Sequence, residues 1–250
     1  MKKYPGKVAV VTGGTRGIGR AISLDLARAG ATVFALYGRD RQSADELSQE
    51  ASKEGLKIHT IRGDLTHPEK FKETIDQIKA QATQVDFVVH CAASGVHKEA
   101  IDLSLKHMKW TFDINVFAVH QLLQELVPLM PSGGRVIGIT SSGGTRVIPY
   151  YAAVGSSKGA LESLFRHYAH EWAPKGIAVN CVCPGLVLTD AVEAFPDKEN
   201  RTKKSVDATP SGRLSTPEDV AGLVNFLCSE FAGQIIGQTI AIDGGKTLLS

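Results

Sequence analysis

The chain has 250 residues, of which 43% are apolar and 22% charged, and it contains 25 glycines. This composition is typical of an ordinary globular chain, and the length suits one α/β domain. The formal net charge is only +2 and no stretch is densely basic, so nucleic-acid binding has little electrostatic support.

The N-terminal segment begins with basic residues, but the apolar run 8–11 that follows is too short for a signal sequence. No later apolar stretch has the length of a membrane span. We therefore expect a cytoplasmic protein without a membrane partner. Apolar runs contain most of the cysteines, which favours reduced buried thiols over disulfides or a metal cage; they are Cys91, Cys181, Cys183 and Cys228.

Short β-branched runs alternate along the chain with longer segments of helical periodicity. The apolar runs are nearly continuous, which indicates strands buried on both faces. This pattern predicts a Rossmann-type, doubly wound parallel sheet of about seven strands with helices on both faces. Ligands of such sheets bind beyond the carboxyl ends of the strands. The predicted strands are 8–11, 32–36, 57–61, 87–89, 135–139, 178–182 and 239–242.

No repeat, low-complexity tract or linker divides the chain, so we predict a single Rossmann-type domain over residues 1–250. One segment, 190–212, is long, polar and irregular. Loops of that length often act as lids. We predict that it is a mobile cover over a substrate.

A glycine-rich sequence follows the first predicted strand and precedes the helical pattern 20–29. It reads Thr12-Gly13-Gly14-Thr15-Arg16-Gly17-Ile18-Gly19. Gly13, Gly17 and Gly19 allow the backbone to turn sharply and to approach a pyrophosphate, which the helix N-terminus then stabilises. Because the motif lies between a strand and a helix, it predicts a dinucleotide site.

With this Thr-Gly-x-x-x-Gly-x-Gly spacing, the chain resembles the short-chain dehydrogenase/reductase family over residues 6–246. The resemblance implies that Asp64-Leu65 contacts the adenine ring and that Asn115 has a structural and proton-relay role. It also implies that Pro184-Gly185 and Thr189 hold the nicotinamide amide. Further cofactor contacts implied in this way are Thr15, Arg16, Ile18, Ala92 and Val187.

The choice of cofactor depends on the residues after the second strand, Tyr37-Gly38-Arg39-Asp40. A guanidinium there clamps a 2′-phosphate, whereas an acidic residue accepts hydrogen bonds from a bare ribose. Arg39 and Arg16 are both placed for a phosphate and predict NADPH. Asp40 lies one residue too far for a diol ligand and leaves NADH as the less favoured alternative.

Two departures from the family pattern are informative. The family's usual Asn-Asn-Ala-Gly is replaced by His90-Cys91-Ala92-Ala93-Ser94-Gly95. The usual Tyr-x-x-x-Lys is replaced by a wider spacing, from Tyr151 to Lys158, with Val154 at the usual tyrosine position. On a helix, residues i and i+7 lie roughly 20° from the same direction and about 10 Å apart along the axis. Tyr151 is therefore expected to reach farther out than a residue at 154.

This wider spacing resembles that of enoyl-thioester reductases within the family. The segments 92–96, 151–158, 189–191 and 209–213 are most similar to the NADPH-dependent enoyl-acyl-carrier-protein reductase III group. In such a reaction hydride adds to the β-carbon while charge collects on the thioester oxygen, two carbons away. Tyr151 is then expected to stabilise the enolate oxygen and Lys158 to hold the nicotinamide ribose.

Other interpretations of the polar residues stay open. Tyr150 is an alternative acid, although it points roughly 80° away from Lys158 around an ideal helix. Ser141 follows the fifth strand and either lines the site or caps a turn. We expect no metal site, because the helical group that contains His167 and His170 lacks a third ligand at a recognised interval. His97 and His107 have no assigned role.

The expected substrate is an acyl thioester, on acyl carrier protein or coenzyme A. The segment at the start of the lid supplies apolar surface for the acyl chain: Val187, Leu188, Ala191, Val192, Ala194 and Phe195. The charged stretch 197–204 is expected to be a solvated loop, with contact to a carrier protein as the alternative. The resemblance also implies a homotetramer with contacts from helices 105–129 and 152–172 and the segment near Asp243. A carbonyl reductase and a non-catalytic NADPH-binding sensor remain as alternative functions.

Overall fold

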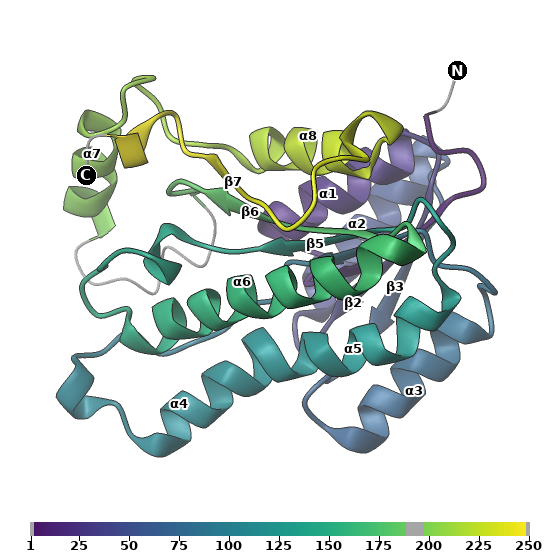
Figure 1. Ribbon diagram of the computed structural model, residues 1–250, viewed down its shortest axis with the longest axis horizontal. Helices are drawn as coiled ribbons and strands as arrows, with labels where there is room; N and C mark the ends of the chain where they lie inside the picture. The colour runs from purple at the N-terminus through teal and green to yellow at the C-terminus, as the bar shows by residue number, and fades with distance from the viewer. Residues whose placement is uncertain (1–2, 189–197, 249–250) are drawn as a thin grey trace.

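The computed structural model describes residues 3–188 and 198–248, and a parallel sheet runs through the middle of this part of the chain (Figure 1). The strand order is β3-β2-β1-β4-β5-β6-β7. This confirms the predicted doubly wound sheet of seven strands. The strands are β1 (Val8–Thr12), β2 (Thr32–Tyr37), β3 (Ile58–Arg62), β4 (Phe87–His90), β5 (Arg135–Ile139), β6 (Ala178–Pro184) and β7 (Thr239–Ile242).

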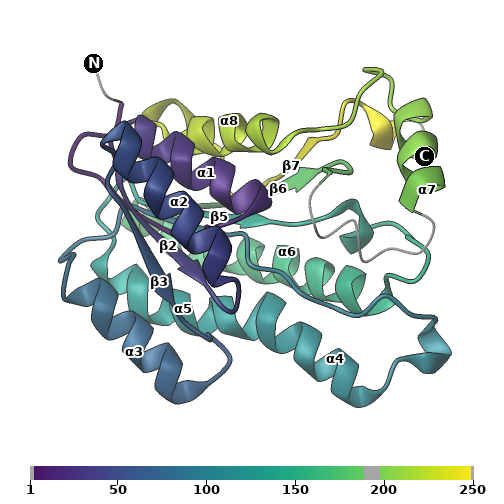
Figure 2. The same ribbon diagram turned by 180° about the vertical axis from the view of Figure 1, so that it is seen from behind.

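Helices cover both faces of the sheet (Figures 1 and 2). On one face lie α1 (Gly17–Arg28), α2 (Arg41–Glu54) and α8 (Pro217–Cys228). On the other lie α3 (Pro68–Lys79), α4 (Leu105–Phe112), α5 (Ala118–Leu126) and α6 (Ala152–Trp172). One more helix, α7 (Lys198–Asp207), stands at the end of the molecule near the C-terminal segment.

Alternate residues of the strands build two separate cores. Val11 of β1 packs with Ile22 of α1 and Val224 of α8, whereas Val10 packs with Leu122 of α5 and Leu161 of α6. Successive side chains of a strand point to opposite faces of the sheet, so a run that is buried throughout supplies both cores.

The strand order changes direction between β1 and β4. The chain moves outward from β1 to β2 and β3, and then crosses back to place β4 on the other side of β1. Ligands of doubly wound sheets bind at such a switch point, beyond the carboxyl ends of the strands. The fold therefore places the candidate site at the ends of β1, β4 and β5.

The central helix predicted over 105–129 is interrupted. A π-helical turn, Asp113–Phe117, separates α4 from α5, and a short 3-10 turn, Val127–Leu129, ends the segment. Asn115 lies inside the π-helical turn and is fully buried. Single π-helical turns within α-helices are frequently found at functional sites.

Part of the predicted lid is helical. The charged stretch 197–204, expected to be a solvated loop, is instead mostly part of α7, and its Lys, Glu and Arg residues are compatible with helical backbone. Lys246 donates a hydrogen bond to Ser205 of α7 at 3.0 Å. Thr189 and the predicted apolar lid residues Ala191, Val192, Ala194 and Phe195 lie outside the described residues. Across 3–188 and 198–248, no helix is both long and apolar enough to cross a membrane.

Candidate active site

The glycine-rich turn after β1 has the geometry of a phosphate cradle. Gly13 and Gly17 adopt φ angles of +64° and +52°, a backbone region that L side chains rarely adopt. A Cβ at Gly19 would overlap the carbonyl of Gly13. Helix α1 begins at Gly17, and Arg16 caps it without a side-chain hydrogen bond. The first N–H groups of α1 therefore remain available to an anion such as a pyrophosphate.

The loop after β4 packs directly on this turn. A Cβ at Gly13 would lie 2.9 Å from Cα of Ala92, so only glycine allows this approach. The hydroxyl oxygen of Thr12 accepts hydrogen bonds from the backbone N–H groups of Cys91 and Ala92, at 3.2 and 3.0 Å. Its own hydrogen is therefore left for Nδ1 of His90, 2.9 Å away.

These contacts explain the replacement of the family's Asn-Asn pair. His90 is fully buried, and burial, with a smaller effect of the Lys158 charge, lowers its pKa to about 3. The imidazole is therefore neutral and acts as an acceptor for Thr12. Burial raises the pKa of the Cys91 thiol to about 11, so this thiol stays protonated. His90 and Cys91 thus support the end of β4 without introducing charge.

Asn115 connects this loop to α6. Its side-chain oxygen accepts from the backbone N–H of Ser94 at 2.9 Å. Its amide nitrogen donates to the backbone oxygen of Ser94 and to the hydroxyl of Ser157, both at 2.9 Å. All hydrogen-bonding directions of the amide except one lone pair are used. Asn115 therefore fixes the Ser94 backbone relative to the helix that carries Lys158.

Lys158 and Tyr151 contact neighbouring positions at the end of β5. The Lys158 amine donates to the backbone oxygen of Ile139 at 2.8 Å. The Tyr151 hydroxyl has a hydrogen bond with the side chain of Ser141. Ser141 has extended backbone, with φ −154° and ψ 149°, and two extended residues span about 6 to 7 Å. The phenol is therefore held farther out along the strand than the amine.

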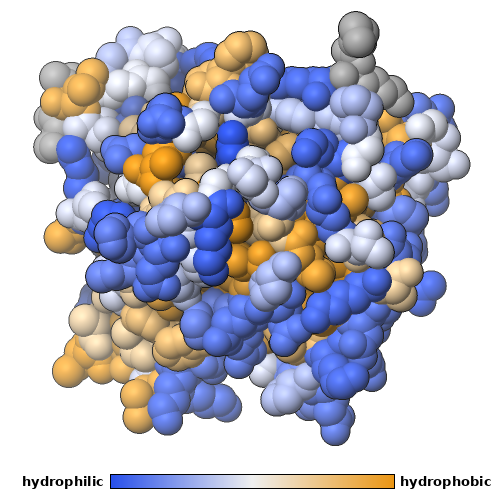
Figure 3. All heavy atoms as spheres, turned by 45° about the vertical axis from the view of Figure 1, so that its right-hand side comes forward, coloured by the Kyte–Doolittle hydropathy of each residue, from blue (hydrophilic) through white to orange (hydrophobic). Residues whose placement is uncertain are grey.

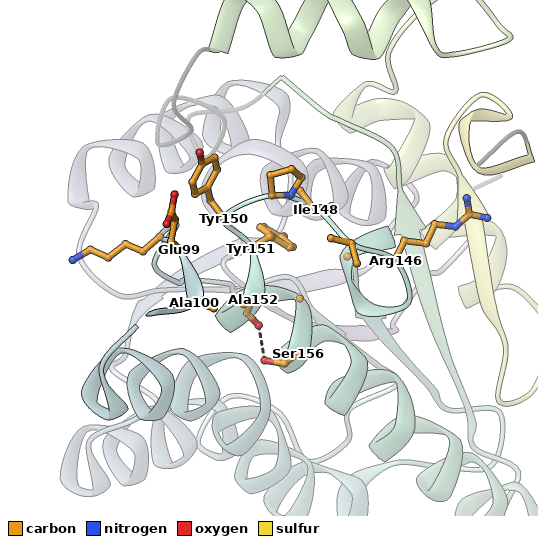
Figure 4. A pocket seen from close by; sticks show the side chains of 13 residues that line it. Glu99, Ala100, Arg146, Ile148, Tyr150, Tyr151, Ala152 and Ser156 are labelled. Atoms are coloured by element: carbon orange, nitrogen blue, oxygen red, sulfur yellow. Dashed lines mark hydrogen bonds between the residues drawn. The ribbon is translucent and has the colours of Figure 1, made fainter. Parts of the chain in front are cut away.

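Tyr151 is the first residue before α6 rather than part of it, with φ −114° and ψ 11°. Tyr150 adopts φ +63°, which is uncommon for a bulky residue and is typical of strained functional segments. The Tyr150 side chain is 44% exposed, and its hydroxyl points away from Tyr151 (Figure 4). The backbone conformation at Tyr150 thus directs the side chain of Tyr151, and not that of Tyr150, toward Ser141.

A cavity of about 460 Å³ lies beside Tyr151. Its walls come from the turn after β5, the start of α6 and the segment 98–100 (Figure 4). Its lining includes Tyr151, Ile148, Gly143, Arg146 and Ala100. The lining combines apolar surface with two phenols, those of Tyr150 and Tyr151, and a few charged side chains, a mixture that is typical of a small-molecule site.

The position where the family usually has its tyrosine is filled. Val154 is buried, and Gly95 packs so closely on it that a Cβ at position 95 would overlap the Val154 side chain. The loop after β4 therefore occupies the space next to residue 154. A phenol at 154 would require this loop to move.

The residues predicted at the adenosine end lie beyond β2 and β3. Arg16 and Arg39 are both exposed. The two carboxylate oxygens of Asp40 accept from the backbone N–H and the hydroxyl of Ser43, at 3.0 and 2.7 Å, which caps α2. Asp64 accepts from the Thr66 hydroxyl at 2.6 Å. The carboxylate of Asp40 is thus already used by the helix, while the two guanidinium groups are exposed to solvent.

The remaining predicted cofactor residues also lie at this edge of the sheet. Thr15 is buried in the glycine-rich turn, and Ile18 packs against the core from the first turn of α1. Leu65 follows β3 and packs partly buried on the other core. After β6, Gly185 donates its N–H to Ile242 at 3.1 Å, and Val187 pairs with Ser215. The structure thus brings the predicted residues to the carboxyl ends of the strands. Thr189 lies outside the described residues.

Sequence reasoning missed His97. Its imidazole stacks on the ring of Tyr151, with centroids 5.5 Å apart and planes inclined by 27°. A histidine in an irregular loop carries no periodic signal, so no pattern pointed to this contact. Among the residues that the structure describes, no group of three or more His, Cys, Asp or Glu side chains is arranged to hold a metal ion.

Comparisons with known proteins agree with this arrangement. A family model described as enoyl-(acyl carrier protein) reductase matches residues 13–247. A 1-cyclohexenylcarbonyl-CoA reductase from Streptomyces collinus is 33% identical over 98% of this chain and 88% of its own length. A 3-oxoacyl-[acyl-carrier-protein] reductase from Staphylococcus epidermidis is 32% identical over 96% of this chain and 98% of its own length.

Solved structures show the same similarity. A short-chain dehydrogenase from Burkholderia cenocepacia in complex with NADP superposes with a TM-score of 0.91 at 29% identity, covering 98% of this chain and 99% of that one. A short-chain dehydrogenase/reductase from Serratia marcescens has a TM-score of 0.91 at 31% identity, with the same coverage. The family model covers nearly the whole chain, and the glycine-rich turn has the geometry that a dinucleotide requires. The chain therefore belongs to the short-chain dehydrogenase/reductase family and is an oxidoreductase with a fold that binds a nicotinamide cofactor.

Proposed function

We propose that the protein reduces the carbon-carbon double bond of a 2-enoyl thioester with hydride from NADPH. The observation that carries the proposal is the position of the Tyr151 phenol. It is bonded to Ser141, beyond the point where Lys158 contacts Ile139. The similarity to an enoyl-(acyl carrier protein) reductase family model and to an enoyl-type CoA reductase supports the same substrate class.

The chemistry of a conjugated thioester explains why the phenol stands farther out. When bound, NADPH supplies a hydride for the β-carbon of the substrate. Charge then develops on the thioester oxygen, two carbons from that position, and a donor held there stabilises the enolate. The α-carbon of the enolate then takes a proton from solvent, which gives the saturated thioester. Tyr151 donates its hydroxyl hydrogen toward this oxygen, and Ser141 keeps the hydroxyl in place. Lys158 holds the ribose hydroxyls and contributes positive charge to the site.

Identification of the product tests this proposal. The enzyme is incubated with crotonyl thioester and NADPH, and the acyl product is analysed by mass spectrometry. The expected product is the butyryl thioester, two mass units heavier than the substrate, formed as NADPH is consumed. Recovery of unchanged crotonyl thioester from an enzyme that consumes NADPH with a ketone would contradict the proposal.

A 3-oxoacyl-thioester reductase is the second candidate, since a reductase of that kind is 32% identical to this chain. Such an enzyme requires its proton donor beside the carbon that receives hydride, because that carbon carries the oxygen. In this chain the usual donor position is Val154, which is buried beneath Gly95. This packing favours the enoyl reaction over the ketone reaction.

NADPH is the proposed cofactor because Arg16 and Arg39 are exposed at the adenosine end, whereas the Asp40 carboxylate caps α2. Replacement Arg39→Ala is expected to raise KM for NADPH about tenfold to a hundredfold, since a guanidinium-phosphate pair contributes strongly to binding. KM for NADH is expected to stay the same. Steady-state kinetics with each cofactor measure this, and equal losses with both would contradict a 2′-phosphate contact.

The pH dependence of kcat/KM follows from the two buried groups. Burial lowers the pKa of Lys158 from its usual 10.5 and raises the pKa of Tyr151 from its usual 10.0. On rising pH, Lys158 therefore loses its positive charge below the usual pKa of a lysine, whereas Tyr151 keeps its proton above the usual pKa of a tyrosine. We expect kcat/KM to fall on the alkaline side below pH 10.5, and this limb to move to higher pH in Lys158→Arg, because arginine keeps its charge. If the alkaline limbs of the wild-type and Lys158→Arg pH profiles coincide, Lys158 is not the titrating group.

We also propose that the substrate is carried on acyl carrier protein or coenzyme A and that the protein is a cytoplasmic homotetramer. Apolar side chains at the α4–α5 side support self-association: Ile101, Leu105 and Phe117 are 89%, 69% and 52% exposed. Figure 3 shows apolar areas on an otherwise largely hydrophilic face of the molecule. Light scattering coupled to size exclusion is expected to give four times the chain mass of 26.7 kDa, and a mass of one chain would reject the tetramer.

A further inference from the structure

His97 lies in the loop that follows β4, and it meets the side chain proposed as the acid. Its imidazole and the Tyr151 ring are stacked, with centroids 5.5 Å apart and planes 27° from parallel. The two residues belong to different segments of the chain. His97 precedes the short 3-10 turn Ala100–Asp102, and Tyr151 precedes α6. A tertiary contact therefore fixes the relation between the two rings.

Two further contacts hold the loop in this position. Asn115 binds both backbone polar groups of Ser94 at 2.9 Å. One residue later, Gly95 packs on Val154 without room for a Cβ. A tyrosine at 154 would fill the space that this backbone uses. The small residues at 95 and 154 thus allow the loop to pack against α6, where His97 contacts Tyr151.

Two glycines also lie close to the Tyr151 ring. A Cβ at Gly143 would lie 2.5 Å from the ring, and a Cβ at Gly155 would lie 3.4 Å from it. Glycine permits the close approach of the ring to the backbone but provides no side chain to hold it. Tyr151 also lies before the first turn of α6, outside the helix. A stacking partner therefore contributes directly to fixing the plane of the ring.

We propose that His97 is a positioning residue for Tyr151: its stacked imidazole holds the phenol in the plane from which the hydroxyl reaches both Ser141 and the substrate oxygen. This inference rests on the proposed role of Tyr151 as the donor. Reaction rates are sensitive to displacement of a catalytic group by as little as about 1 Å. His97 therefore contributes to kcat through Tyr151, without itself exchanging a proton with the substrate.

A double-mutant cycle tests the proposal. His97→Ala is expected to lower kcat for the thioester about tenfold or more, with little change in NADPH affinity or Tm. His97→Phe keeps a flat stacking ring and is expected to recover most of the rate. In a Tyr151→Phe background, His97→Ala is expected to cause no further loss, because the hydroxyl that it positions is already absent.

His59 provides a matched control. It is exposed and stacks on Phe34 with centroids 5.3 Å apart and planes inclined by 26°, on β3 and β2. His59→Ala therefore removes a stack of the same geometry away from Tyr151, and kcat is expected to stay at the wild-type value. A comparable loss in this variant would mean that any lost stack slows the enzyme, which would overturn a specific role for His97.

Three other outcomes would overturn the proposal: multiplicative losses in the double variant, no recovery in His97→Phe, or an effect confined to KM. The cycle is measured with both a crotonyl and an acetoacetyl thioester. A non-additive cycle seen only with the acetoacetyl substrate retains the His97 role and rejects the enoyl reaction. If Tyr151→Phe keeps the wild-type rate, Tyr151 is not the donor, and the proposed role of His97 is overturned whichever thioester is reduced.

Discussion

Replacement Tyr151→Phe is expected to lower kcat for an enoyl thioester by about 10²–10³, the usual effect of removing one donor to a developing oxyanion. The phenylalanine keeps the ring, its stack with His97 and its contacts with Gly143. It removes the hydrogen bond with Ser141 and the donor to the substrate. KM and Tm are expected to change little, because the hydroxyl acts on charge that forms only in the transition state.

Tyr150→Phe is the matched control, since it removes a neighbouring phenol hydroxyl that is exposed and points away from Tyr151. Steady-state kinetics should show wild-type kcat in this variant. If Tyr150→Phe loses the rate and Tyr151→Phe does not, the donor has been assigned to the wrong phenol.

Lys158→Met is expected to lower kcat/KM by about 10²–10³, since it removes the positive charge from the site while keeping a similar chain length. The same change is expected to leave Tm unchanged or raised. Lys158 is only 4% exposed, and an amine buried to that extent costs solvation free energy that methionine does not.

Kinetics and thermal unfolding of one preparation measure both effects. Lys72→Met serves as the control, because Lys72 lies on the surface of α3 and forms an ion pair with Asp76 one turn away. It should keep wild-type kinetics. A strongly lowered Tm in Lys158→Met, together with loss of NADPH binding, would indicate that Lys158 chiefly supports the fold.

Much of the fold could be predicted because its signals are local. Each strand is a short apolar run, and each predicted strand lies within two residues of the observed bounds at both ends. The glycines at 13, 17 and 19 are required by backbone conformation or close approach, so their spacing alone identified the turn. The start of α6 at Ala152 also matched the prediction.

The interrupted central helix and the helix in the lid could not be predicted. Nothing in the sequence around Asn115 distinguishes a π-helical turn from regular helix, and the hydrogen bonds that Asn115 makes from this turn lead to Ser94 and Ser157, far away in the chain. Propensity is a weak signal for a charged segment such as α7, where a solvated loop was expected.

The detailed site likewise depends on tertiary contacts. The replacement of Asn-Asn by His90-Cys91 is visible in the sequence, but the role of His90 as acceptor for Thr12 follows only once β1 and β4 are neighbours. The stack of His97 on Tyr151 requires the packing of Gly95 on Val154. The seven-residue spacing predicted which phenol faces the site, and the structure adds what holds it there.

The most direct test of the account compares kcat/KM for a crotonyl thioester with kcat/KM for the matching acetoacetyl thioester, using wild-type enzyme and NADPH. The phenol bonded to Ser141, beyond Lys158, predicts a preference for the crotonyl substrate of about tenfold or more. A preference for the acetoacetyl substrate would contradict the enoyl reaction and would show that the donor at position 151 serves a ketone.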